Sequence, residues 1–263
     1  MAIKIGFVLD KGGVGKTTSA VNVAAFLATM GKRVLALDLT TEANLTVSFG
    51  FDVQALDIGM CRVFDGDAIS KNTFTVFENL DICPSKPDLN EIIFNAKIFA
   101  HAKKNEILKY RIKEVEDRYD IIIMDTPPAS QHILTMNCLG AADYIILPMQ
   151  LEYLAFTGFG HILDTIKRVR DEEWLNPDLK IMGLLGTFYQ NTNNSKEHAK
   201  DLDEEFSKNF NVFKTKIRKN VALSECVRTG IPICRYDKNC HGYEDYENVT
   251  KEILEYVQNN GSH

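Results

Sequence analysis

Short apolar runs recur along the chain and alternate with longer stretches in which apolar residues return every three or four positions. Runs that are apolar at consecutive positions are typical of parallel strands covered on both faces. They predict strands over residues 3–9, 33–37, 80–83, 120–124, 144–147 and 181–186. The periodic stretches predict helices over residues 18–30, 106–117, 158–170, 196–206 and 245–258. Gly31 follows the first of these helices, where a capping glycine belongs.

The alternation of strands and helices predicts a doubly wound α/β fold, with a mostly parallel sheet and helices on both faces. The sequence shows no internal repeat and no linker rich in glycine, proline or serine, so we expect a single domain over residues 1–260. The tail Gly261-Ser262-His263 resembles a vector-derived remnant and is left out of that domain. Residues 51–105 are less regular, and only the strand at 80–83 is assigned there.

Composition and charge narrow the classes of protein. The 263 residues are 45% hydrophobic and 25% charged, which excludes disordered and fibrous proteins. Thirty basic and 36 acidic residues give a net charge of −6, which by itself argues against binding to nucleic acid. Between residues 206 and 240, however, eight basic residues face two acidic ones. That segment carries +6 and the other 228 residues carry −12, so the net charge does not exclude a local phosphate-binding patch.

The sequence also indicates where the protein resides. No apolar run approaches the roughly 18 residues of a membrane-spanning helix, and the first residues lack the layout of a signal peptide. We therefore expect a cytoplasmic protein. The six cysteines are scattered without a Cys-x-x-Cys pair, which predicts reduced thiols. Cys234, Cys240 and His241 fit no standard metal-ligand spacing, so no metal site is predicted from them.

A glycine-rich segment lies between the first predicted strand and the first predicted helix. It consists of Lys11, Gly12, Gly13, Val14, Gly15, Lys16, Thr17 and Thr18. Glycines let backbone N–H groups approach phosphate oxygens closely, and the start of a helix adds a positive dipole end. In such a loop Lys16 reaches the β- and γ-phosphates, and the Thr17 hydroxyl binds Mg²⁺. The segment therefore predicts a site for ATP and Mg²⁺, with a ligand-free glycine turn as the alternative.

The apolar run at 120–124 ends in Asp125, which is followed by Thr126, Pro127 and Pro128. A carboxylate at the carboxyl end of a central strand lies at the ligand crevice of an open sheet. There Asp125 would hold a Mg²⁺-bound water, as a Walker B acid does, although an aspartate in this position can also be a turn or helix cap. The two prolines stiffen a loop that could respond to the γ-phosphate.

A second lysine, Lys11, stands before the two glycines, and this resembles the deviant phosphate loop of the ParA/MinD family of P-loop ATPases. Residues 148–153, 183–189, 217–225 and 230–233 also resemble the family, and the chain is most similar to its Soj-like partition branch. The resemblance implies an ATP-dependent homodimer in which Lys11 reaches the partner's nucleotide. It also implies DNA binding without sequence preference, a ParB-like adaptor that stimulates hydrolysis, association with the nucleoid when ATP is bound, and a plasmid or chromosome as cargo.

The loop after the second predicted strand departs from the family pattern Asp-x-Asp-Pro-Gln-x-Asn. The chain keeps Asp38 and Asn44, but Thr40 replaces the second aspartate, which in the family orients the attacking water. A hydroxyl can hydrogen-bond a water but cannot take its proton as a carboxylate does. We therefore predict slow hydrolysis, with a nearly non-hydrolysing nucleotide-dependent scaffold as the alternative. The predicted catalytic residues are Lys11, Lys16, Asp38 and Thr40.

Basic residues near the C-terminus are the predicted DNA contacts, because the resemblance implies that the family binds DNA there. The candidates are Lys214, Lys216, Arg218, Lys219 and Arg235. Lys219 matches a DNA-contacting arginine of the family, whereas Asn191 replaces a second one, which predicts weaker binding. A MinD-like positioning ATPase would need a basic amphipathic C-terminal helix, but residues 244–252 are acidic, so no membrane partner is expected. An iron–sulfur carrier would need paired cysteines, which the sequence lacks.

Overall fold

The computed structural model describes residues 1–263 except 97, 99–102, 130–131, 152–155 and 261–263. Within the described residues, seven strands form one sheet in the order β3-β4-β2-β5-β1-β6-β7. All neighbouring strands run parallel except the edge strand β3, which is antiparallel to β4. The strands are β1 (Ile3–Phe7), β2 (Val34–Asp38), β3 (Phe74–Phe77), β4 (Leu80–Cys83), β5 (Ile121–Asp125), β6 (Tyr144–Gln150) and β7 (Lys180–Thr187).

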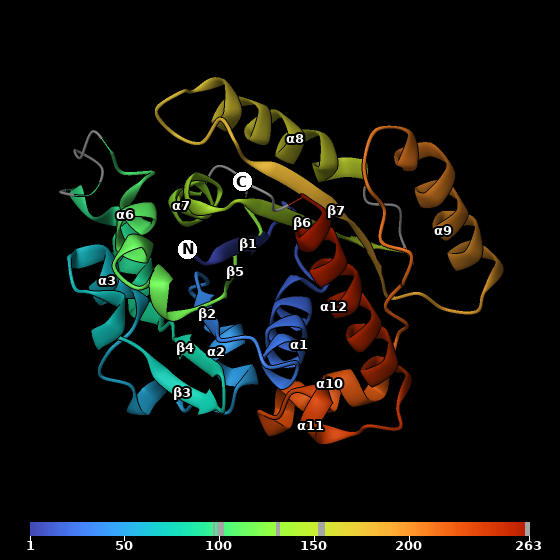
Figure 1. Ribbon diagram of the computed structural model, residues 1–263, viewed down its shortest axis with the longest axis horizontal. Coiled ribbons are helices and arrows are strands. Elements are labelled where there is room, and N and C mark those ends of the chain that lie inside the picture. Colours follow the sequence, from blue (N-terminus) through green and yellow to red (C-terminus); the bar gives the residue numbers. More distant parts are fainter. Residues whose placement is uncertain (97, 99–102, 130–131, 152–155, 261–263) are drawn as a thin grey trace.

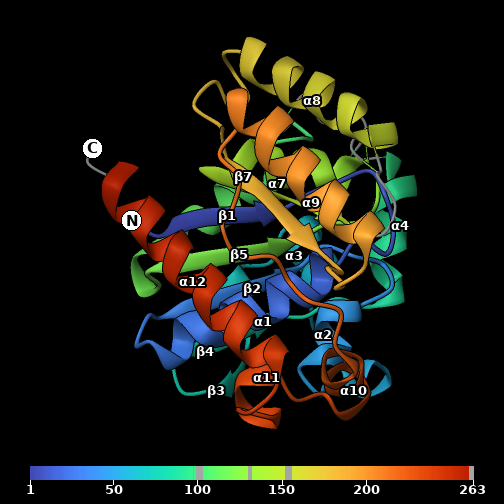
Figure 2. The same ribbon diagram turned by 90° about the vertical axis from the view of Figure 1, so that its right-hand side faces the viewer.

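Helices cover both faces of the sheet (Figures 1 and 2). One face is covered by α1 (Lys16–Thr29), α2 (Asn44–Ser48), α10 (Val221–Thr229), α11 (Ile233–Tyr236) and α12 (His241–Asn260). The other is covered by α3 (Met60–Asp65), α4 (Asn90–Phe94), α6 (Ile107–Lys113), α7 (Ile133–Ala141), α8 (Phe156–Asp171) and α9 (Asn193–Glu205). This arrangement confirms the predicted doubly wound α/β fold.

The continuous apolar runs arise because each central strand sends side chains into two cores. In β5, Ile121 and Ile123 pack with the α1 and α12 side, while Ile122 and Met124 pack with the α6 and α7 side. Successive side chains of a strand point to opposite faces, so a strand covered on both sides must be apolar at every position. Full burial of one such side chain stabilises the fold by about 1.5–3 kcal/mol.

Several elements differ from those predicted. The hydrophobic pattern did not predict strand β3 or the helices α2, α3, α4, α7, α10 and α11, and all of them have nine residues or fewer. The predicted helix over residues 106–117 ends at Lys113 and is followed by a 3₁₀ turn, Glu116–Arg118. The region 51–105, in which only the strand at 80–83 was predicted, contributes that strand, β4, and the unpredicted β3 to one edge of the sheet.

Helix α1 begins and ends at glycines with left-handed backbone angles. Gly15 precedes it with φ 88°, and Gly31 follows it with φ 82°. Beyond the helix end, Gly31 N donates to Ala28 O at 3.0 Å and Lys32 N donates to Leu27 O at 3.1 Å. These two bonds form a Schellman motif, which satisfies carbonyls that the helix end would otherwise leave unpaired. The capping role predicted for Gly31 is therefore what the structure shows.

Among the described residues, no helix combines the length and the apolar character needed to cross a lipid bilayer.

Candidate nucleotide-binding site

The phosphate loop connects β1 to α1 at the carboxyl edge of the sheet. Gly13 and Gly15 have φ values of 73° and 88°, which a residue with a Cβ adopts only with strain. The end of β7 supports the loop, because Thr187 Oγ1 donates to Val14 O at 2.9 Å. The loop is thus held in a wound conformation that places α1's free N–H groups at the edge of a cavity, a ready anion-binding arrangement.

Lys16, the first residue of α1, is buried with only 6% of its surface exposed. Its Nζ donates to Leu9 O at 3.0 Å and to Lys11 O at 2.8 Å. Burial lowers the pKa of Lys16, while the negative charges of Asp125 and other nearby acidic residues oppose that shift. The ammonium group is therefore fixed inside the phosphate loop by the backbone itself.

Thr17 and Asp125 come together although 108 residues separate them, with Thr17 Oγ1 donating to Asp125 Oδ2 at 2.6 Å. Asp125 ends β5 and is fully buried, and its Oδ1 has no hydrogen-bond partner among the described residues. Burial, and then the nearby charge of Asp38, raise the pKa of Asp125 to about 8. A hydroxyl beside a buried, unpartnered carboxylate oxygen is a donor set that suits Mg²⁺, which prefers hard oxygen ligands. The residues present therefore fit a magnesium ion.

Asp38 ends β2 directly beside Asp125 in the parallel register. It is fully buried and accepts four hydrogen bonds. The donors are Thr40 N at 3.0 Å, Thr40 Oγ1 at 2.7 Å, Thr46 N at 2.9 Å and Thr46 Oγ1 at 2.7 Å. Burial raises the pKa of Asp38, and the four hydrogen bonds oppose that shift. Asp38 thus anchors the loop that carries Thr40.

The phosphate loop opens onto a cavity of about 420 Å³, lined also by Thr40, Thr126 and Pro128. A smaller cavity of about 170 Å³ adjoins it, lined by apolar side chains that include Leu223 and Ile217. The two cavities share four lining residues, Gly15, Thr18, Phe188 and Val227. The adjoining cavities give the site a polar end at the phosphate loop and a largely apolar end, a combination that suits a nucleotide.

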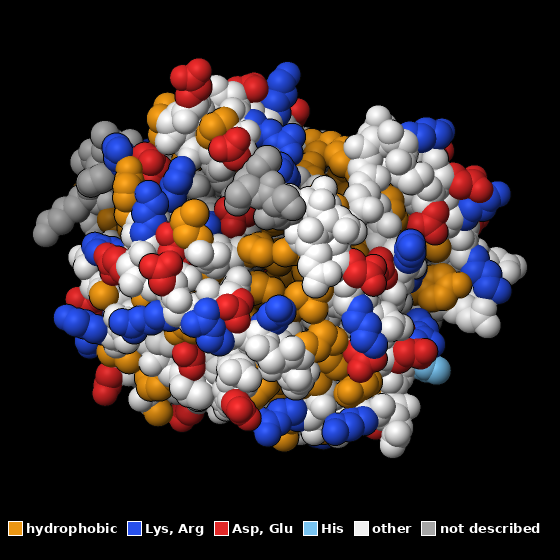
Figure 3. Space-filling model, viewed as in Figure 1, with side chains coloured by type: hydrophobic (Ala, Val, Ile, Leu, Met, Phe, Trp, Pro, Cys, Tyr) orange, Lys and Arg blue, Asp and Glu red, His pale blue; other side chains and the backbone are white. Residues whose placement is uncertain are grey.

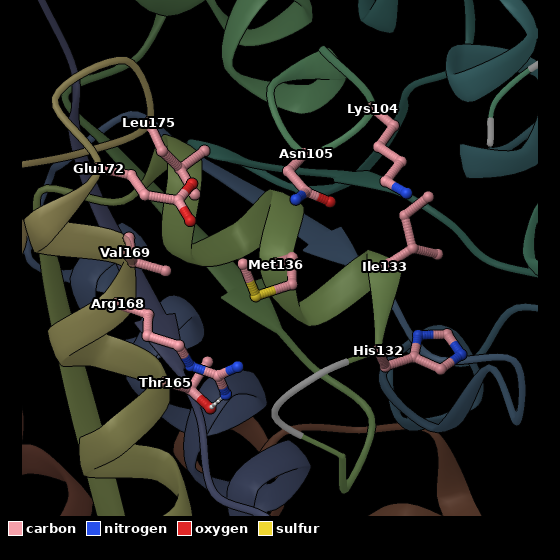
Figure 4. Close-up of a pocket in the computed structure, with 10 residues that line it drawn as sticks. All are labelled: Lys104, Asn105, His132, Ile133, Met136, Thr165, Arg168, Val169, Glu172 and Leu175. Carbon is pink, nitrogen blue, oxygen red and sulfur yellow. Dashed lines mark hydrogen bonds between the residues drawn. The ribbon is translucent and has the colours of Figure 1, made fainter. Parts of the chain in front are cut away.

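Another cavity lies between α7 and α8, on the opposite face of the sheet from α1 (Figure 4). Met136, Ile133 and Val169 form its apolar surface, and Arg168 and Lys104 lie around it. At the edge of this cavity His132 caps α7, because its Nδ1 accepts a hydrogen bond from the Leu134 N–H at 3.3 Å. The lining contains no glycine loop, and the start of α7 at its edge is already capped by the His132 side chain, so we assign the nucleotide to the cavity at the phosphate loop.

Two of the predicted DNA contacts are engaged in ion pairs. Lys216 Nζ lies 2.7 Å from Asp203 Oδ1, and its side chain is 11% exposed. Arg218 Nη2 lies 2.5 Å from Asp245 Oδ1 and 2.6 Å from Glu244 Oε2. These acidic partners belong to α9 and α12, outside the basic segment 206–240. The space-filling view shows basic and acidic side chains next to each other over α10–α12 (Figure 3). The surface is therefore less basic than the segment charge indicated.

The other three predicted contacts are exposed. Lys214 and Lys219 lie on the segment between β7 and α10, and Arg235 lies in α11. The Arg235 guanidinium carbon sits 4.5 Å from the centre of the Phe77 ring, a cation–π contact with β3. These three side chains are exposed to solvent, in contrast to the partly buried Lys216 and Arg218.

Some residues of the site were missed by sequence reasoning. Thr46 and Ser85 form a hydrogen-bonded group with Asp38 and Thr40, and their only sequence signal is a hydroxyl after each strand. Phe188 lines both cavities with a left-handed φ of 55°. A bulky residue in that conformation is uncommon and marks a constrained position, but nothing in the sequence reveals its backbone angle.

The sheet, the phosphate loop and the acid at the end of β5 define a P-loop NTPase. A family model described as an AAA domain matches residues 2–181. The chain is 37% identical over 250 residues to Bacillus subtilis "Sporulation initiation inhibitor protein Soj", covering 93% of this chain and 95% of that protein. It is 32% identical to the Caulobacter vibrioides "Chromosome partitioning protein ParA", covering 93% and 91%. The chain therefore belongs to the ParA/Soj family of partition ATPases.

Solved structures agree with this fold. The cobyrinic acid a,c-diamide synthase of Mycobacterium smegmatis, solved with an ATP analog and magnesium, has a TM-score of 0.85 and 28% identity to this chain. The comparison covers 99% of this chain and 97% of that one. The resemblance to ParA-type proteins stated from the phosphate loop and the later segments is thus confirmed at the level of family and fold.

Proposed function

We propose that this chain is a ParA-type switch that binds ATP and Mg²⁺, closes into a homodimer, binds DNA without sequence preference and drives the segregation of a plasmid or chromosome. The observation that carries the proposal is the contact of Thr17 with Asp125 beside the buried Lys16, at the mouth of a cavity with an apolar end. The names of the relatives, which describe chromosome partitioning, support the biological role.

In this proposal the loop N–H groups and Lys16 bind the phosphates, and Thr17 and Asp125 hold the metal ion. The bound Mg²⁺ neutralises charge on the phosphates. The base lies in the apolar end of the site, against Phe188 and Leu223, which line it. Lys11, at the start of the loop, reaches the nucleotide of the partner subunit in the homodimer.

Hydrolysis is slow in this proposal, because Thr40 offers a hydroxyl where a carboxylate would orient and deprotonate water. A ParB-like adaptor accelerates it and thereby releases the DNA. The protein is cytoplasmic, acts as one domain over residues 1–260, and associates with the nucleoid while ATP is bound. A nearly non-hydrolysing scaffold remains the second candidate, since the Thr40 hydroxyl proton is already donated to Asp38.

DNA binding measured without nucleotide, with ADP and with ATP, each at two salt concentrations, tests the proposal. We expect binding with ATP alone, and we expect it to weaken steeply with salt because it depends on phosphate contacts. Lys16→Ala serves as the control and should abolish the ATP response. Absence of DNA binding in every condition would remove DNA from the proposal, and phosphate release with and without DNA separates the switch from the scaffold.

A further inference from the structure

A buried chain of hydroxyl groups connects the end of β4 to the loop that carries Thr40. Ser85, two residues beyond β4, donates from Oγ to Thr40 O at 2.5 Å, with a longer contact of 3.4 Å to Lys86 O. The Ser85 N–H donates to Thr46 Oγ1 at 2.9 Å, and that hydroxyl donates to Asp38 Oδ2 at 2.7 Å. None of Ser85, Thr46, Asp38 and Thr40 is more than 3% exposed.

These bonds hold Thr40 from two sides. Asp38 accepts the Thr40 hydroxyl and N–H, while Ser85 fixes the Thr40 carbonyl. The Thr46 hydroxyl donates once and accepts once, so it joins Ser85 to Asp38 in a fixed direction. Removing one partner of a buried hydrogen bond leaves the other partner unsatisfied, which destabilises the folded conformation. Loss of the Ser85 or Thr46 hydroxyl should therefore loosen the loop that carries Thr40.

We propose that Ser85 and Thr46 are positioning residues, which hold Thr40 in place for hydrolysis without contacting the nucleotide themselves. Of these three residues, Thr40 lines the cavity at the phosphate loop, and Ser85 and Thr46 lie behind it. This inference rests on the proposed ATPase function. It predicts that loss of either hydroxyl lowers turnover, which depends on the position of Thr40, and leaves nucleotide affinity, which depends on the phosphate loop, unchanged.

Hydrogen–deuterium exchange on full-length Ser85→Ala tests the positioning directly. The amides of Thr40 and Thr46 both donate to Asp38, and we expect the peptide that contains them to exchange about five- to tenfold faster once the serine hydroxyl is lost. The kcat for ATP should fall by a similar factor, while the Kd of a non-hydrolysable ATP analogue stays unchanged. Because exchange needs no turnover, a wild-type protein without ATPase activity would refute the proposed function and still leave the positioning measurable.

Thr46 provides a matched pair of variants. Thr46→Val keeps the side-chain shape and removes the hydroxyl, so it should raise loop exchange and lower kcat at least as much as Ser85→Ala. Thr46→Ser keeps the hydroxyl and should return both quantities to about their wild-type values. Thr250→Val is the control, because Thr250 is equally buried but donates only to Tyr246 O within α12. It should change stability without changing exchange in the loop. The inference is overturned if loop exchange stays at the wild-type rate in folded Ser85→Ala and Thr46→Val, or if analogue affinity falls while kcat is retained.

Discussion

Thr40 lines the cavity at the phosphate loop, and its hydroxyl proton is already donated to Asp38. Its Oγ1 donates to Asp38 Oδ1 at 2.7 Å, so a water beside it can only donate to the remaining lone pairs. The hydroxyl has no basic group with which to take up the water's proton. In the proposed function, phosphoryl transfer therefore relies on the charges of Lys16 and of a bound metal ion, and Thr40 contributes only by orienting the water, which is compatible with slow turnover because the transition state is loose.

Thr40→Asp should raise ATP turnover by about tenfold or more, because a carboxylate can orient the water and accept its proton. Phosphate release in the presence of DNA measures the effect, and Thr40→Asn, similar in shape but uncharged, should give no gain. The new carboxylate lies beside the buried Asp38, so its pKa in the folded state is raised and the variant should melt below wild type at pH 7. That difference should narrow as the pH falls and the carboxylate takes up a proton. Equal rates for Thr40→Asp and Thr40→Asn would show that a missing carboxylate does not limit hydrolysis.

The residues of the site differ in how far the sequence reveals them. The phosphate loop could be predicted because consecutive residues form it, and Asp125 because it ends a long apolar strand. Ser85 and Thr46 could not be predicted, because their pairing depends on β4 lying beside β2, which brings together residues 39 to 45 positions apart. For the same reason, the acidic partners of Lys216 and Arg218 were absent from a count made along one segment.

At the scale of elements, the pattern revealed those that are long or buried on both faces. Strand β3 was missed because it is a four-residue edge strand with half-buried positions, and its antiparallel pairing with β4 includes a register shift. Helix α7 was missed because it is apolar and buried around nearly all of its circumference, so it shows no 3.6-residue alternation. Helices of five or six residues, such as α2 and α3, are too short for any period to show.

Two glycines at helices provide a test of local backbone energetics. A Cβ at Gly31 would meet no atom within 4 Å, so Gly31→Ala should destabilise the protein only through its left-handed φ, by about 1 kcal/mol. Gly160 lies inside α8, and a Cβ added there would also meet no atom within 4 Å, so Gly160→Ala should stabilise the protein by up to about 1 kcal/mol. Urea denaturation of both variants measures the two opposite shifts. A stabilised Gly31→Ala protein would contradict the capping role.

At the scale of the whole molecule, the net charge of −6 coexists with a segment of +6. In the folded protein part of that positive charge is neutralised, because acidic residues of α9 and α12 pair with Lys216 and Arg218. Lys214, Lys219 and Arg235 are exposed, and they are the candidate DNA contacts of the proposed function. In the proposed homodimer, two copies of this weak site would belong to one complex. Nucleotide-driven dimerisation would therefore raise the overall affinity for DNA.

Neighbouring residues should therefore respond in opposite ways to loss of their charge. Lys219→Ala should weaken DNA binding and reduce the slope of log K against log salt by about one per protomer, with at most a small fall in melting temperature because the side chain is exposed. Arg218→Ala should leave that slope unchanged but destabilise the fold by about 1–2 kcal/mol, because it removes the partner of Asp245, which is 3% exposed. Lys180→Ala, at the amino end of β7 and away from the phosphate loop, is the exposed control and should change neither property. If Arg218→Ala instead lowered the salt slope as much as Lys219→Ala while the fold kept its stability, the ion pair with Asp245 would not withhold Arg218 from DNA, and the whole basic segment would act as the contact surface.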